Sequence, residues 1–156
     1  MASTWIELEV KCRDPRWETI MKAKDAPHVT LAYLGKDVAD KDAWKAVSTV
    51  DAWLEEMQRL CALRDTFYVT AYDCFAFNTT VVKLTPAGIL TKEHRGLLVE
   101  MLQAVGLNIS TVYEFVPHVT VGHGPYVMGE EVAGIEIVGT RVRMMHKSEE
   151  MSSWCL

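Results

Sequence analysis

The sequence predicts a single α+β domain built from two similar halves. Two long segments have clean helical periodicity, and β-like segments precede and follow each of them. The pentapeptide Pro27–Leu31 reappears, with one conservative change, as Pro117–Val121, and such an internal repeat is typical of a two-half arrangement. No linker or low-complexity tract divides the 156 residues, so residues 1–156 are predicted to form one domain.

The first half opens with an alternating segment. Apolar and polar residues alternate from Trp5 to Val10, which has the period of a half-buried strand. Asp14 and Pro15 combine a capping residue with proline at the first helical position, so a short helix is predicted to about Lys24. The run 29–34, ended by a glycine, has the composition of another strand.

A long amphipathic helix and a hairpin follow. After Asp40, apolar residues recur at steps of three and four, with acidic residues near the start. The predicted buried stripe consists of Ala43, Val47, Val50, Leu54, Met57 and Cys61. Segments 67–77 and 81–84 are rich in β-branched and aromatic residues and flank Asn78–Thr79, which favours a hairpin.

The second half has its own helix. It is predicted to begin after Thr91 as a cap and to end at Gly106. Its apolar stripe, with one histidine, consists of His94, Leu97, Leu98, Met101, Leu102 and Val105. Segment 112–121 is strand-like, and segments 135–137 and 142–144 add further alternation.

Composition narrows the functional classes. The chain is 49% hydrophobic and 24% charged, with no apolar run of roughly 20 residues and no signal-like start, so we expect a cytoplasmic protein without a membrane partner. A formal charge of −5 argues against tracking a long nucleic acid and favours a small nucleotide or short oligonucleotide. The cysteines have no metal or redox spacing, which predicts free, buried thiols: Cys12, Cys61, Cys74 and Cys155.

The repeated motif carries the candidate chemistry. On a strand, His28 and Thr30 project from one face, and so do His118 and Thr120. Histidine titrates near neutrality, so a neutral imidazole can take a proton from an attacking hydroxyl while a protonated partner donates to the leaving oxygen. The threonine hydroxyls can donate to the non-bridging oxygens of a phosphate. Two facing motifs therefore match phosphodiester cleavage.

These residues make the chain resemble the two-histidine (2H) phosphoesterases, which carry two H-x-T or H-x-S motifs. The resemblance covers most of the chain, including the proline before each motif and the segment Val142–Ser148 as a closing strand. It implies a bilobal, pseudo-symmetric α+β fold, with two antiparallel sheets around a central cleft and helices outside. It also implies catalytic roles for His28 and His118 and phosphate contacts for Thr30 and Thr120.

The resemblance leaves several substrates open. Members include RNA 2′,3′-cyclic phosphodiesterases, 2′,5′-oligoadenylate phosphodiesterases and small phage enzymes that destroy the cyclic oligonucleotide signals of bacterial defence. The compact length and acidic charge favour the last two. Further substrate contacts are predicted at Tyr33, His123 and Tyr126, where aromatic faces can stack on a base and His123 follows the second motif closely. Trp5 and Trp154 are weaker stacking candidates, because tryptophans are more often core.

Three alternatives are weighed against this interpretation. A histidine at a strand end is commonly only hydrogen-bonded within the structure, although two matched copies disfavour that explanation. A metal site is disfavoured because no H-E-x-x-H, C-x-x-C or Asp-rich loop accompanies the histidines, so no metal and no cofactor are predicted. A non-catalytic nucleotide sponge or adaptor is the alternative from another class. Glu149 and Glu150 are interpreted as a solvated surface run.

Overall fold

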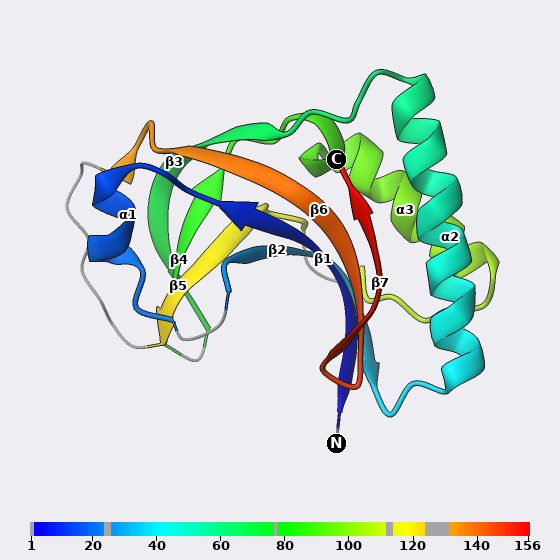
Figure 1. Cartoon of the computed structure of the whole chain (residues 1–156). Coiled ribbons are helices and arrows are strands. Elements are labelled where there is room, and N and C mark those ends of the chain that lie inside the picture. The colour runs from blue at the N-terminus through cyan, green and yellow to red at the C-terminus, as the bar shows by residue number, and fades with distance from the viewer. Residues whose placement is uncertain (1, 24–25, 77, 112–113, 124–131) are drawn as a thin grey trace.

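The computed structural model describes residues 2–23, 26–76, 78–111, 114–123 and 132–156. Its strands form one strongly curved antiparallel sheet, with two long helices packed on one side of it (Figure 1). The strands are β1 Ser3–Lys11, β2 His28–Lys36, β3 Thr66–Phe75, β4 Thr79–Leu84, β5 His118–His123, β6 Glu136–His146 and β7 Glu149–Cys155. The helices are α1 Pro15–Ile20, α2 Asp40–Arg59 and α3 Lys92–Ala104, with a short 3₁₀ turn η1 at Gly88–Leu90.

The strand order explains the two lobes. It runs β2-β1-β6-β3-β4-β5, and β7 pairs with β6 beside this path. Strand β3 connects the two lobes, because its first three residues pair with β6 and its later residues pair with β4. One lobe contains β2, β1, β6 and β7, and the other contains β4, β5 and most of β3.

Curvature brings the two ends of this sheet together. Strands β2 and β5 lie at opposite ends of the order, yet they contact each other. The segment before β2 also binds to β5, because the amides of Lys22 and Ala23 both donate to the carbonyl of Val121, at 2.6 and 2.7 Å. Each of these two strands begins with the histidine of one repeated motif. The fold thus places the two motifs opposite each other.

The hydrophobic core lies between the sheet and helices α2 and α3. Strand residues that point towards these helices, such as Leu8 and Val142, are fully buried, and so is Trp53 on α2. The indole of Trp53 donates to the carbonyl of His94 on α3 at 3.0 Å, which joins the two helices. Within the described part of the chain, no helix has the length and apolar character needed to cross a membrane.

The starts of helices α1 and α3 confirm the capping residues predicted from the sequence. Asp14 caps α1 by accepting from the amide of Arg16, and Thr91 caps α3 by accepting from the amide of His94. Helix α1 ends at Ile20, earlier than Lys24. The stripe of α2 is shifted from the prediction, since Ala46 and Trp53 are buried while Cys61 lies beyond the helix and is exposed.

Several strand and cysteine predictions were wrong. Segment 114–117 is not a strand, because β5 starts only at His118. The strand-like segments 135–137 and 142–144 belong to one continuous strand, β6, which starts at Glu136. Glu149 and Glu150 are exposed, as predicted for a solvated surface run, but they also begin a seventh strand, Glu149–Cys155, that was not predicted and whose backbone pairs with β6. The cysteines are free as predicted, but three are exposed (Cys61, Cys74 and Cys155) and Cys12 is only partly buried. Their small side chains are not needed in a core already filled by larger apolar residues.

Candidate active site

The two motif histidines are held in matching ways by their own backbone. His28 Nδ1 lies 3.0 Å from the carbonyl oxygen of Ala26, and His118 Nδ1 lies 2.7 Å from that of Val116. A carbonyl only accepts hydrogen bonds, so each Nδ1 carries the proton and donates it. In both rings Nε2 is therefore the nitrogen left for a reacting group.

The proline before each histidine contributes to this geometry. Proline keeps the preceding residue extended and has no amide donor of its own. The carbonyls of Pro27 and Pro117 accept from Val10 and Leu84, at 3.2 and 2.9 Å, which prolongs strand pairing one residue beyond β2 and β5. The internal repeat thus extends to the hydrogen bonds that orient each imidazole.

Residues from both motifs line one cavity. This cavity has a volume of about 220 Å³ and is lined by Ala23, Ala26, His28, Thr120 and His123. His118 is not among the residues that line it, but lies close enough for the charge of His28 to affect its titration. The structure thus brings together His28, His118, Thr120 and His123, four of the seven predicted site residues.

The other three predicted residues differ in their placement. Thr30 pairs with Glu7 two residues along β2 from His28, on the same face, and is not among the residues lining the cavity. Tyr33 lies further along β2, is 48% exposed and shares a hydrogen bond of 3.2 Å with Ser3. Tyr126 lies outside the described residues.

The two imidazoles have different surroundings. Burial lowers the pKa of His118; its hydrogen bond to Val116 opposes this shift, and the nearby charge of His28 adds to it. The edge of Phe75 packs against the His118 ring, with ring centroids 4.7 Å apart and an interplanar angle of 67°. The lowered pKa favours neutral His118 near pH 7, with its lone pair on Nε2.

A charged network covers the face of β1 and β6 beside His28. Glu9 pairs in register with both His28 and Arg141, and Glu7 pairs with both Thr30 and Arg143, so these side chains share one face. Arg143 donates to Glu7 at 2.8 Å, and Arg141 donates to Glu9 at 3.1 Å. Ion pairs from Arg141 and Arg143 reach Glu150 on β7, at 3.2 and 3.5 Å.

Sequence reasoning missed this network and the two carbonyl acceptors. Alternating charges on β1 and β6 were visible, but nothing in the sequence shows that β6 pairs with β1 across more than 130 positions. The carbonyls of Ala26 and Val116 carry no side-chain signal. Their shared position, two residues before each histidine, could have indicated them once the repeat was found.

No group of three or more potential ligands in the described part of the chain (His, Cys, Asp or Glu) is arranged to hold a metal ion. His94 and His146 lie apart from the cavity and have other partners. His94 bonds to Gly88, while His146 contacts Thr4 and Asp40. Trp154 donates to Asp51 on α2, so it packs against the helix and not in the cleft.

Solved structures of phosphoesterases share this architecture. The MHV ns2 PDE domain superimposes with a TM-score of 0.62 at 14% identity, over 97% of this chain and 100% of that one. A crystal structure described as a phosphoesterase gives 0.61 at 12% identity, over 99% and 98%. E. coli LigT complexed with 3′-AMP gives 0.57 at 15% identity, over 99% and 98%.

No family model and no curated protein sequence matches this chain. At such low identity the structural likeness bears on the fold alone. The bilobal α+β architecture implied by the two H-x-T motifs is confirmed: the chain has the fold of the two-histidine phosphoesterases.

Proposed function

We propose that this chain is a metal-independent phosphodiesterase that cleaves a phosphodiester in a small nucleotide by acid–base catalysis with His28 and His118. One observation carries the proposal. Two imidazoles from opposite lobes lie close to each other, His28 lines a cavity together with Thr120 of the second motif, and each imidazole donates its Nδ1 proton to a carbonyl two residues before it. This leaves two Nε2 atoms for proton transfer, and Thr120 lines the same cavity as a donor to phosphate oxygens.

The surroundings of the two histidines suggest separate roles. His118, with its lowered pKa, is the base: its Nε2 takes a proton from the attacking water or ribose hydroxyl. The nucleophile forms the new bond to phosphorus as the bond to the leaving oxygen breaks. His28, as imidazolium, donates its Nε2 proton to that oxygen. Charge repulsion between the rings disfavours the state in which both are imidazolium, and so favours one neutral ring beside one charged ring, which this cycle requires.

A small nucleotide is the ligand class that the comparisons support. The E. coli LigT structures are described as complexes with 3′-AMP, NADP+ and ATP. The net charge of −5 disfavours a long polyanion. Within this class we propose a cyclic oligonucleotide signal, of the kind used in bacterial defence, or a 2′,5′-linked oligoadenylate as substrate.

The direct test is a substrate panel. The protein is incubated with cyclic di- and trinucleotides, 2′,5′-oligoadenylate and 2′,3′-cyclic mononucleotides, with and without EDTA, and the products are separated by chromatography. We expect cleavage of a cyclic oligonucleotide or 2′,5′-oligoadenylate at the same rate in both conditions, because the histidines supply both proton transfers.

Each other outcome of the panel selects an alternative. Turnover of 2′,3′-cyclic mononucleotides alone would identify an RNA 2′,3′-cyclic phosphate phosphodiesterase. Activity lost in EDTA and restored by a divalent ion would contradict metal independence. Tight binding with every ligand recovered intact would favour the sponge.

The assignment of His118 as base predicts a pH dependence. Protonation of His118 removes the base, so kcat/KM should fall on the acid side at a pH below about 6.5, the ordinary histidine value. In an NMR titration, the pKa of His118 should lie below that value in the wild type and rise in His28→Gln, because one cause of the lowering is removed. A His118 ring that titrates above 6.5 in the wild type would contradict this assignment.

A further inference from the structure

An apolar row crosses the sheet beside the two motifs. Trp5 on β1 pairs in register with Tyr33 on β2 and with Met145 on β6. Directly paired residues share a face, so these three side chains, called the apolar row below, lie on one face of three adjacent strands. Two residues along β1, Glu7 pairs with Thr30 of the first motif. The apolar row is therefore the next row after the one that contains Thr30, on the same face of the sheet, called the cleft face below.

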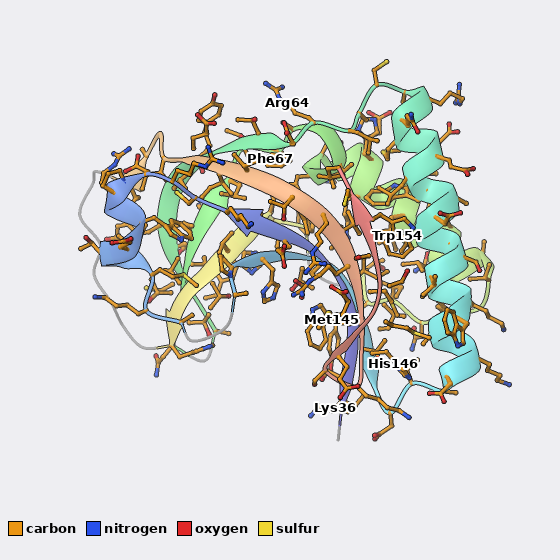
Figure 2. The ribbon with its side chains drawn as sticks, viewed as in Figure 1. Lys36, Arg64, Phe67, Met145, His146 and Trp154 are labelled. Carbon is orange, nitrogen blue, oxygen red and sulfur yellow. The ribbon has the colours of Figure 1, made fainter. Side chains whose placement is uncertain are left out.

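This face is opposite the helical core. Figure 2 shows Met145 on the inner side of the curved sheet, whereas Trp154 and His146 lie on the side that faces α2. Tyr33 is 48% exposed. The Trp5 indole donates to Glu7 at 2.8 Å, and the Tyr33 hydroxyl shares a hydrogen bond with Ser3 at 3.2 Å. Both rings are thus held in place by their polar ends.

The neighbouring charges restrict what this part of the cleft accepts. Arg141 and Arg143 form ion pairs with Glu7, Glu9 and Glu150, so the network has one more carboxylate than guanidinium. A second phosphate placed beside Trp5 and Tyr33 would meet arginines whose guanidinium groups are already paired with carboxylates. An uncharged planar group meets no such penalty.

The cavity at the histidines is too small for a whole nucleotide. Its volume of about 220 Å³ is below the roughly 300–1,000 Å³ typical of small-molecule sites. A phosphate held between His28 and His118 would therefore leave its base outside the cavity, along the cleft face. On the β2 side, the first exposed aromatic surface beyond Thr30 in the described structure is Tyr33.

We propose that Tyr33 and Trp5 form a stacking platform for the nucleobase attached to the phosphate that the two histidines hold. This inference rests on the proposed function for the position of the phosphate. Stacking uses the π-face that every base has, and purines present a larger face than pyrimidines. The substrate class is thus a nucleotide with an uncharged purine on the β2 side of the scissile phosphate.

Binding measurements test the platform without requiring turnover. Isothermal titration compares 3′-AMP with ribose 3-phosphate, which has the phosphate and sugar without a base. We expect the wild type to bind 3′-AMP more tightly. Tyr33→Ala should weaken 3′-AMP binding about 5- to 100-fold, the range of alanine substitutions at base-stacking aromatics, and leave ribose 3-phosphate unchanged.

Matched variants separate stacking from structural effects. Tyr33→Phe retains the ring and loses only the bond to Ser3, so it should retain affinity for 3′-AMP. Trp5→Leu should weaken 3′-AMP selectively, as Tyr33→Ala does. Trp44→Ala removes an aromatic ring that is 57% exposed on α2, outside the cleft, and should have no effect.

The outcomes distinguish this inference from the proposed function. Equal wild-type affinities for the two ligands, or unchanged 3′-AMP binding in both Tyr33→Ala and Trp5→Leu, would overturn the platform even if the enzyme is active. If 3′-AMP binding depends on these rings but the protein cleaves no substrate in the panel, the stacking platform would stand and the proposed phosphodiesterase activity would be refuted.

Discussion

Replacing either motif histidine with alanine is expected to lower kcat by about 10²- to 10⁴-fold, the usual contribution of a positioned acid or base. His118→Ala removes the proposed base, and His28→Ala removes the proposed acid. The two act on one proton-transfer cycle, so the double variant should lose little more than the stronger single variant. Steady-state rates on the substrate found in the panel give the measurement.

His94→Asn is the matched control for these variants. His94 lies on α3, apart from the cavity, and its Nδ1 contacts the carbonyl of Gly88. Asparagine keeps a donor near that carbonyl, so the rate should stay near that of the wild type. Circular dichroism checks that all variants fold. A wild-type rate in either folded alanine variant would refute the catalytic pair.

Arg143→Met is expected to destabilise the fold by about 3–5 kcal/mol, because it leaves a buried carboxylate without its charge partner. Glu7 is 1% exposed, and Arg143 is its ion-pair partner at 2.8 Å. The indole of Trp5 remains as a single neutral donor to this carboxylate. Urea denaturation at pH 7 measures the change in the free energy of unfolding.

Two further variants test the reason for this loss. Adding Glu7→Gln to Arg143→Met removes the buried charge and should recover part of the stability. Arg59→Met breaks an ion pair with Glu56 at the exposed end of α2, where the arginine side chain is 67% exposed, and should cost at most about 1 kcal/mol. A loss of less than 1 kcal/mol in Arg143→Met would show that the network contributes little to stability.

Local sequence signals were sufficient where structure depends on neighbours along the chain. The caps at Asp14 and Thr91, the periodicity of α2 and α3, and the hairpin around Asn78 all follow from interactions within a few residues. The same holds for the H-x-T repeat, since alternation on a strand places each histidine and its threonine on one face.

Strand β7 shows where this information ends. Glu149–Cys155 contains two adjacent glutamates and two adjacent serines, and its composition is typical of an exposed segment. It is a strand because β6 lies beside it, after the turn at Lys147–Ser148, where both residues have positive φ. Pairing with β6 also changes the role of Glu150, which joins Arg141 and Arg143.

The sequence alone therefore predicted most of the helices and strands and the candidate site: two histidines, each with a threonine, once in each half. Only the tertiary structure decided which groups surround them. Curvature of the sheet brings β2 and β5 together, burial lowers the pKa of His118, and register places Trp5 and Tyr33 beside the first motif. These features depend on pairing between segments distant in sequence, which periodicity within one segment does not encode.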